Sequence, residues 1–206
     1  LKKRDREEIF KEVRNQLNRT YGQFWKDRDK AILSEHKSSE ERREFYERVY
    51  NNIFFVTEKP KSVLDLGCGL NYLTYKEYIG KKVYFIANEL TEYDCTKIRE
   101  YFKKNNILGE VIQADLREYN EFPSVDVCFM FKLLESIEFK GHKIAEYLIS
   151  NIKSKYIVVS FATRDLKGEK MNYPRRGWFE QMCKRLGYIF TKFEEKNEIF
   201  YIVKKF

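Results

Sequence analysis

The stretch Val63–Gly69, which reads VLDLGCG, constrains the fold more than any other part of this sequence. An apolar run of strand length leads directly into a turn with two glycines, which accept backbone angles that other residues avoid. In open α/β sheets, such turns follow the carboxyl ends of strands, where ligands bind. The chain is therefore expected to contain a parallel sheet with a ligand site beside this turn.

After Pro60, strand-like and helix-like segments alternate along the chain. The predicted strands are 61–66, 82–87, 109–114, 125–131 and 156–161, and the predicted helices are 91–105, 144–153 and 177–186. Two further strands, 188–193 and 199–203, flank a short polar segment and are expected to form a hairpin. This order predicts a doubly wound α/β sheet of seven strands that ends in an antiparallel hairpin. That is the arrangement of the Rossmann-like class I methyltransferases.

The residues before this sheet differ from it in composition. They are rich in charge and contain almost no Gly or Pro, and we predict a helical N-terminal region over 1–57 and a second domain over 58–206. A helix that begins near Ser39 would have one side formed by Phe45, Val49, Asn52 and Ile53.

Composition excludes several classes of protein. Of the 206 residues, only 9 are Gly and 3 are Pro, so low-complexity and Pro-rich classes do not apply. No apolar run approaches the ~20 residues that span a bilayer, and the first ten residues lack the apolar segment of a signal peptide. The four cysteines form no CxxC pair and there are only two histidines. We therefore expect a cytoplasmic protein without disulfides or a metal site.

The residue type before the glycine turn indicates which ligand the turn accepts. A dinucleotide-binding turn would need a third glycine where Tyr72 stands, and the carboxylate of Asp65 would repel a pyrophosphate. A cationic ligand suits that carboxylate, and S-adenosylmethionine (SAM) carries a sulfonium and an ammonium group. We predict SAM as the cofactor, held by Asp65, Gly67, Cys68 and Gly69; a purely structural glycine turn is the alternative.

Two more acidic residues follow predicted strands in positions that fit this cofactor. Glu89 lies 24 residues after Asp65, near the ~20-residue offset at which an acid binds ribose hydroxyls. Asp115, followed by Leu116, comes directly after the third strand. There, with neighbouring backbone amides, it is expected to bind the adenine amino group.

The fourth strand, 125–131, should lead into the catalytic segment. It lacks the Asn/Asp/Ser-Pro-Pro-aromatic motif of amino-directed DNA methyltransferases, and no Pro-Cys pair supports carbon-5 chemistry. Cys128 is better explained as a buried strand residue. A target with a free lone pair, such as guanine N7, needs only alignment with the methyl group. Phe129 or Phe131 is a candidate for stacking on the base, although strand aromatics more often lie in the core.

A basic segment follows the fifth strand and should overhang the same edge of the sheet. Residues 161–187 hold seven basic and three acidic side chains, within a chain of net charge +8. Arginines interleaved with aromatic residues suit RNA phosphates and unstacked bases. The expected RNA contacts here are Arg164, Lys170, Arg175 and Arg176. The alternative is a solvated loop and an amphipathic helix with Trp178 in the core.

Together these segments resemble the aminoglycoside-resistance 16S rRNA methyltransferases. The similarity rests on residues 36–42 (HKSSEER), 65–71 (DLGCGLN) and 158–164 (VVSFATR), with Leu166, Gly168, Tyr173, Phe179 and Glu180. The chain departs from the family in reading Asn71-Tyr72 where Asn-Pro is usual, in its short N-terminal region, and in most of the segment Phe131–Leu134.

The resemblance implies a SAM-dependent enzyme that methylates a base of 16S rRNA in the assembled small subunit. In the resistance family the target is guanine N7. Archaeal relatives, which the thermophile-like composition also brings into consideration, methylate a cytidine N4 once or twice. Phe131, Ser160, Phe161 and Arg164 would border the base, and the N-terminal region, including His36 and Arg42, would dock on the subunit. We expect a monomer.

Two other functions remain open from the sequence. A small-molecule SAM methyltransferase would have a lid over its pocket and no need for the basic segment. A non-catalytic assembly factor that retains the SAM fold would bind the subunit without transferring a methyl group.

Overall fold

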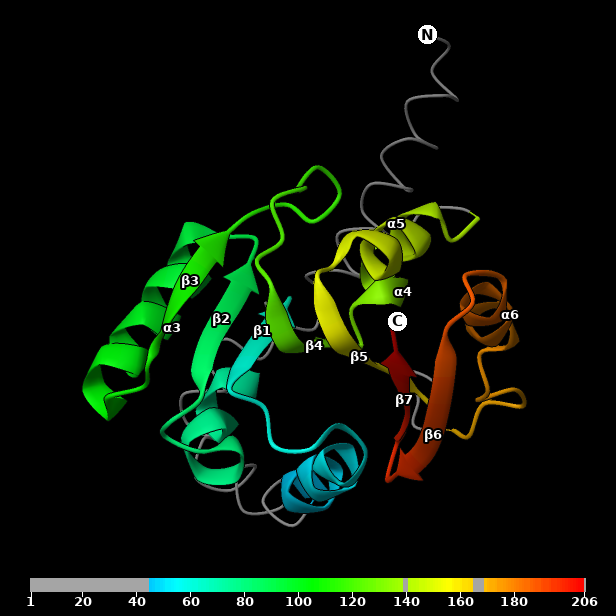
Figure 1. The fold of residues 1–206 in the computed structure, drawn as a ribbon, viewed down its shortest axis with the longest axis horizontal. Coiled ribbons are helices and arrows are strands. Elements are labelled where there is room, and N and C mark those ends of the chain that lie inside the picture. The colour runs from blue at the N-terminus through cyan, green and yellow to red at the C-terminus, as the bar shows by residue number, and fades with distance from the viewer. Residues whose placement is uncertain (1–44, 139–140, 165–168, 206) are drawn as a thin grey trace, which may run out of the picture. The chain divides into compact units, whose positions relative to one another are not determined.

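The computed structural model describes residues 45–138, 141–164 and 169–205 (Figure 1). The chain divides into two compact units, residues 1–44 and residues 45–206, and the described residues all belong to the second unit. The predicted docking residues His36 and Arg42 lie outside the described residues.

The described residues form a seven-stranded sheet in the order β3-β2-β1-β4-β5-β7-β6. The strands are β1 (Ser62–Leu66), β2 (Tyr84–Glu89), β3 (Gly109–Gln113), β4 (Val125–Phe131), β5 (Ser154–Ala162), β6 (Ile189–Glu195) and β7 (Glu198–Lys204). The first five are parallel, whereas β7 runs antiparallel to both of its neighbours, β5 and β6. The predicted seven-stranded α/β sheet with a terminal hairpin is confirmed.

Helices connect these strands. They are η1 (Asn71–Thr74), η2 (Tyr75–Ile79), α3 (Glu92–Asn105), α4 (Leu134–Ile137), α5 (Lys143–Asn151) and α6 (Gly177–Arg185), with a further helix over 45–57. Helix α3 is capped at its start by Thr91, whose side chain accepts a hydrogen bond from the Asp94 amide, and at its end by Asn106 in a left-handed conformation. The short helices η1, η2 and α4 were not predicted, because four or five residues are too few to show a helical period.

Alternate residues of each strand pack into two separate clusters, one on each face of the sheet. On one face, strand side chains such as Leu66, Met130 and Val159 pack against α4, α5 and α6. On the other face, residues such as Phe85, Phe129 and Phe200 pack against η1, η2, α3 and the helix at 45–57. Figure 1 shows β3 and β6 at the two ends of this sheet.

The helix at 45–57 belongs to the same core as the sheet. Of the residues predicted to share one side of this helix, Phe45, Val49 and Ile53 are buried and Asn52 is exposed, while Tyr50 is also buried. The compact unit that contains the sheet begins at Phe45. The division into a docking region over 1–57 and a second domain over 58–206 stays a prediction.

The strand order reverses between β1 and β4, which are neighbours near the middle of the sheet. Asp65 of β1 lies opposite Phe129 of β4, and chain segments leave these two strands toward opposite ends of the sheet. A ligand of an open α/β sheet binds outside the carboxyl ends of the strands at such a point. The glycine turn and the segment that begins at Lys132 meet there. None of the described helices is long and apolar enough to cross a membrane.

The packing of β3 against β2 yields a stability prediction. A Cβ atom on Gly109 would lie 2.0 Å from the carbonyl oxygen of Phe85, a backbone atom that cannot move without breaking the sheet. Gly109→Ala should therefore lower the free energy of unfolding by about 2–4 kcal/mol. Urea unfolding measures this, with Gly177→Ala as the control, since a Cβ there meets nothing within 4 Å. Equal stability of the two variants would contradict the prediction.

Candidate functional site

The glycine turn after β1 is fixed by the end of β2. Gly67 and Gly69 have φ angles of +58° and +53°, which favour glycine. The Gly67 amide donates to Asn88 Oδ1 (3.3 Å), and the Cys68 amide donates to the Asn88 carbonyl (3.0 Å). The Gly69 amide donates to Glu89 Oε1 (2.7 Å). The turn is thus already held in shape by protein groups.

Gly67 also lies directly beneath the segment that follows β4. A Cβ atom at this position would come within 2.6 Å of Leu133 Cδ1. The predicted cofactor turn and the predicted catalytic segment are therefore in contact.

Asp65 is the buried acidic group of this site, with 1% of its surface exposed. Its Oδ2 accepts hydrogen bonds from the hydroxyl of Tyr75 (2.7 Å) and the amide of Asn71 (3.2 Å). Its Oδ1 is buried and has no hydrogen-bond partner among the described residues. Burial raises the pKa of Asp65 to about 7, against the lowering effect of its two hydrogen bonds. A carboxylate in this state has one oxygen left for a cationic or hydrogen-bonding ligand.

Glu89 and Asp115 lie at the same edge but already have partners. Glu89 accepts from the Gly69 amide and, through Oε2, from the Leu90 amide (3.1 Å); burial raises its pKa. Each of its oxygens keeps a second lone pair for a ribose hydroxyl. Asp115 is paired with Arg117, whose Nε lies 2.8 Å from Oδ1, and this pairing lowers the pKa of Asp115. Arg117 would have to share this carboxylate with an adenine amino group.

Cys68 and Leu116 offer a ligand only their backbone. The Cys68 side chain is 2% exposed and lies among core residues, and burial raises its pKa well above the ordinary value. Leu116 is 5% exposed and packs into the opposite core cluster.

Three polar residues of this site were not identified as such from the sequence. Asn71 and Tyr75 hold Asp65, and Asn88 joins the glycine turn to β3 by donating to the carbonyls of Ile112 and Ala114, both at 3.2 Å. The signal for Asn88 was present, since a polar amide ends an otherwise apolar strand. Tyr75 gave no such signal because a tyrosine in a short helix is common.

These groups fit a SAM-type cofactor. The unpartnered Oδ1 of Asp65 suits a cation, the glycine turn follows Asp65 at the carboxyl end of β1, and Glu89 can accept from hydroxyls. Among the described residues, no group of three or more His, Cys, Asp and Glu side chains could hold a metal ion. The four cysteines are buried free thiols.

The aromatic residues predicted near the target base are mostly core residues. Phe161 and Phe129 are completely buried. Phe161 packs edge-on against Trp178 and Phe179, so the expectation that it borders the base does not agree with the structure. Phe131 is half-buried at the end of β4 and stacks on Phe129, with ring centroids 5.0 Å apart. Of these three rings, only Phe131 remains a candidate for contact with a base.

Ser160 is also enclosed. Its side chain is completely buried, and its hydroxyl donates to Glu198 Oε2 (2.8 Å) while accepting from the Lys132 amide (3.1 Å). The hydroxyl therefore supports the end of β4. It does not face a base, contrary to the expectation that Ser160 borders the target.

Arg176 does not reach the surface, contrary to the expectation that it binds a phosphate. Its side chain is 8% exposed. It donates to the carbonyls of Ala162 (2.9 Å) and Pro174 (2.6 Å) and to the carboxylate of Glu135 (2.6 Å), and it lies over the ring of Phe161. Arg176 ties the segment before α6 to β5 and α4, which is a structural role.

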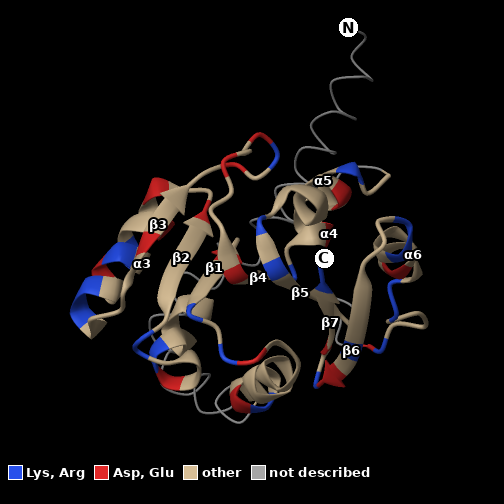
Figure 2. Cartoon of the chain, in the orientation of Figure 1, with Lys and Arg blue, Asp and Glu red and all other residues tan. Residues whose placement is uncertain are grey.

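The other predicted cations of this segment are more accessible. Arg175 is 64% exposed and pairs with buried Glu180, whose pKa it lowers to about 2. Arg164 and Lys170 face each other in an isolated antiparallel bridge, and Lys170 is exposed. Figure 2 shows Lys and Arg (blue) along the segment that leads into α6. These three residues stay predicted RNA contacts.

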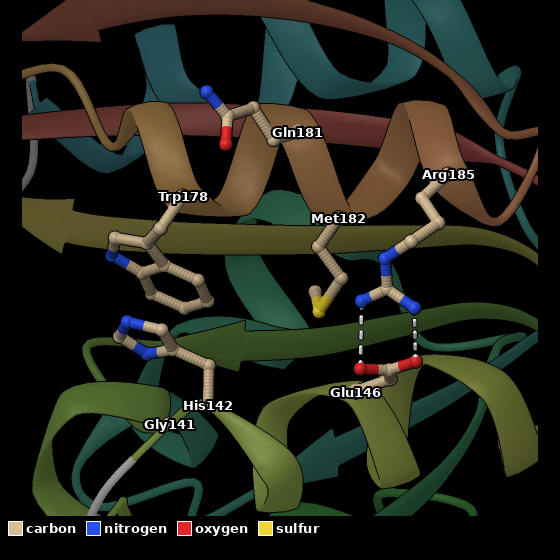
Figure 3. A pocket seen from close by; sticks show the side chains of 7 residues that line it. All are labelled: Gly141, His142, Glu146, Trp178, Gln181, Met182 and Arg185. Carbon is tan, nitrogen blue, oxygen red and sulfur yellow. Dashed lines mark hydrogen bonds and ion pairs between the residues drawn. The ribbon is translucent and has the colours of Figure 1, made fainter.

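A separate pocket of about 300 Å³ lies between α5 and α6. The rings of His142 and Trp178 stack there with centroids 3.8 Å apart, and Arg185 donates two hydrogen bonds to Glu146 (Figure 3). No residue predicted to bind the cofactor lines it.

The raised pKa of Asp65 predicts how stability depends on pH. The unfolded carboxyl ionises near pH 4 but the folded one only near pH 7, so the folded state binds more protons in between and loses stability as pH rises through this range. Asp65→Asn removes this loss. At pH 8 the variant should be about 2–4 kcal/mol more stable than the unliganded wild type, and the difference should disappear near pH 4. Urea unfolding at both pH values measures this, and a difference independent of pH would contradict it.

The buried position of Arg176 predicts a large structural effect. Arg176→Met keeps most of the side-chain volume but removes the hydrogen bonds to the carbonyls of Ala162 and Pro174 and to Glu135, and should cost about 2–4 kcal/mol of unfolding free energy. The control is Arg99→Met, which breaks an exposed pair with Glu92 and should cost less than about 1 kcal/mol. Chemical unfolding compares them, and a near-neutral Arg176→Met would refute the structural role.

Known structures share this fold. The crystal structure of 16S rRNA methyltransferase RmtF in complex with S-adenosyl-L-homocysteine superposes with a TM-score of 0.74 over 95% of this chain and 83% of that one, at 20% sequence identity.

Two curated relatives are similar in sequence. A 16S rRNA (guanine(1405)-N(7))-methyltransferase of Micromonospora rosea is 25% identical over 182 residues, which cover 86% of this chain and 66% of that protein. A protein of the same name from Serratia marcescens is 30% identical over 186 residues, which cover 85% of this chain and 70% of that protein. The chain thus spans about two thirds of the length of these relatives.

A family profile described as ribosomal RNA methyltransferase (FmrO) matches residues 6–202. This match covers nearly the whole chain, including the glycine turn, the acidic strand ends and the basic segment, and it confirms the resemblance found in the sequence. The chain belongs to the ribosomal RNA methyltransferase (FmrO) family.

Proposed function

We propose that this protein is a SAM-dependent methyltransferase that modifies guanine N7 in 16S rRNA of the small ribosomal subunit. The observation that carries the proposal is the buried Asp65 carboxylate, whose unpartnered oxygen lies beside the glycine turn. The chain that contains this turn belongs to a family of ribosomal RNA methyltransferases. A structural glycine turn would not need an acid with a free, buried oxygen beside it.

Four elements of the chain would hold the cofactor. Asp65 offers its free Oδ1, the Gly67–Gly69 turn follows it in the chain, Glu89 accepts from ribose hydroxyls, and Asp115 accepts from the adenine amino group. When bound, SAM supplies an activated methyl group. The chain's own contribution is to align the target nitrogen with that group and to exclude water.

Guanine N7 is favoured over cytidine N4 as the target. The curated relatives are named for guanine N7. A cytidine amino group would also need an acceptor for its proton, and the hydroxyl of Ser160 is completely buried and donates to Glu198. A ring nitrogen with a free lone pair needs no such acceptor.

The substrate of the proposed enzyme is the assembled subunit rather than free RNA. The basic segment with Arg164, Lys170 and Arg175 would contact phosphates beside the target. The N-terminal region, with His36 and Arg42, would add docking surface. We further propose that the enzyme acts as a monomer in the cytoplasm.

Methyl transfer tests this function directly. Small subunits from a strain that lacks the modification are incubated with labelled SAM, and the nucleosides are identified by mass spectrometry. We expect 7-methylguanosine, with transfer to naked 16S rRNA at least tenfold slower. A different modified nucleoside would overturn the assignment of the target, and equal activity on naked RNA would overturn the docking role.

The cofactor site has its own test. Asp65→Asn should weaken S-adenosylhomocysteine binding at least tenfold in calorimetry, since it removes the charge beside the ligand's ammonium group. Asp126→Asn is the matched control, because Asp126 caps the amides of Lys61 and Ser62 at the opposite end of the sheet. It should bind within about twofold of wild type. Equal affinity of wild type, Asp65→Asn and Asp126→Asn for S-adenosylhomocysteine would contradict the proposed cofactor site.

A further inference from the structure

Three polar residues form a closed network where β4, β5 and β7 meet. Lys132 Nζ lies 2.7 Å from Glu198 Oε1, and Glu198 Oε2 accepts a hydrogen bond from the Ser160 hydroxyl (2.8 Å). The Lys132 amide donates to both the hydroxyl and the carbonyl of Ser160, at 3.1 Å each. We call these three residues the edge network.

The edge network is built to hold one conformation. Ser160 is completely buried, and the Glu198 side chain is 13% exposed. Lys132 has a φ angle of +54°, which a residue with a side chain adopts only when its surroundings require it. The neighbouring Leu133 lies over Gly67 of the cofactor turn. The network therefore fixes the backbone that separates the cofactor site from the carboxyl end of β4.

Within this network, the side chain of Lys132 is the most exposed part. It is 51% exposed, at the edge where the strand order reverses. A base that reacts beside the glycine turn approaches this edge, next to the half-buried ring of Phe131. Glu198 cancels the charge of Lys132 there.

The charge balance of methyl transfer explains why the charge of Lys132 beside the base matters. The N7 lone pair of guanine forms the new bond to the methyl carbon, while the carbon–sulfur bond breaks and its electron pair stays on sulfur. The positive charge moves from sulfur to the guanine ring, and no proton is transferred. An unpaired ammonium group beside the ring would oppose this charge as it develops, whereas a paired one would not.

We propose that Glu198 is a positioning residue that neutralises Lys132 beside the target base, so that the base can become cationic during methyl transfer. This rests on the proposed function. Ser160 orients the Glu198 carboxylate, and the Glu198–Lys132 pair forms a polar but electrically neutral wall of the base site.

A double-mutant cycle separates this role from a structural one. Glu198→Gln keeps the shape and the hydrogen bond from Ser160 but leaves Lys132 unpaired, and should lower kcat at least tenfold. Lys132→Met should lower kcat only two- to fivefold. The double variant should recover to the level of Lys132→Met, because no ammonium group remains. In all three, KM for subunits and the affinity for S-adenosylhomocysteine should stay within about threefold of wild type.

The matched control is Glu195→Gln. Glu195 lies opposite Glu198 in the hairpin, has a similar exposure of 16%, and pairs with Arg48 at 2.6 Å. Its loss removes an ion pair of similar exposure in which Lys132 takes no part, and kcat should fall less than threefold. Thermal unfolding verifies that each variant is folded.

A structural role for the pair predicts a different pattern. Glu198→Gln, Lys132→Met and the double variant would then be equally impaired, since each removes the same ion pair, and this result would overturn the inference. Equal losses in Glu195→Gln and Glu198→Gln would also overturn it. Wild type that binds S-adenosylhomocysteine but transfers no methyl group would instead overturn the proposed function and this inference with it.

Discussion

The amide of Asn88 is the interaction on which the site depends. Its oxygen accepts from the amide of Gly67, and its nitrogen donates to the carbonyls of Ile112 and Ala114, so one buried side chain joins the ends of β1, β2 and β3. These strand ends carry the acidic residues that would bind a cofactor. Because every polar atom of this amide is used, the strands have one relative position, and the glycine turn is formed before any ligand arrives.

The opposite side of the site is held by a second set of polar contacts. The edge network fixes the end of β4, and Arg176 fixes α4 and the segment before α6 to the end of β5. Both groups of contacts lie at the carboxyl edge of the sheet, and each is centred on a buried side chain, Ser160 in one and Arg176 in the other. In the proposed function, the Asn88 contacts would form the cofactor side of the site and this second set the base side, and the two meet where Leu133 covers Gly67.

The sequence predicted the sheet well because strands and helices have different apolar periods, and the glycine turn marks where the first strand ends. The three acidic residues of the predicted cofactor site lie at or just beyond the carboxyl ends of β1, β2 and β3, and their role in binding a cofactor stays a prediction. The sequence-based predictions were wrong for Phe161, Ser160 and Arg176, which are all enclosed. Residue type shows that an arginine or a serine is polar, but not whether its partner is an RNA phosphate or a distant residue of the same chain. Glu198, 38 positions after Ser160, is such a partner.

The protonation of Asp65 has a consequence for ligand binding itself. With a pKa of about 7, this carboxyl is partly neutral in the cell, whereas a bound cation would require it to be ionised. Binding should therefore release a fraction of a proton, and the heat of binding should vary with the ionisation enthalpy of the buffer. The affinity for a cationic cofactor would rise as the medium becomes more alkaline, up to the point at which the free site is already ionised.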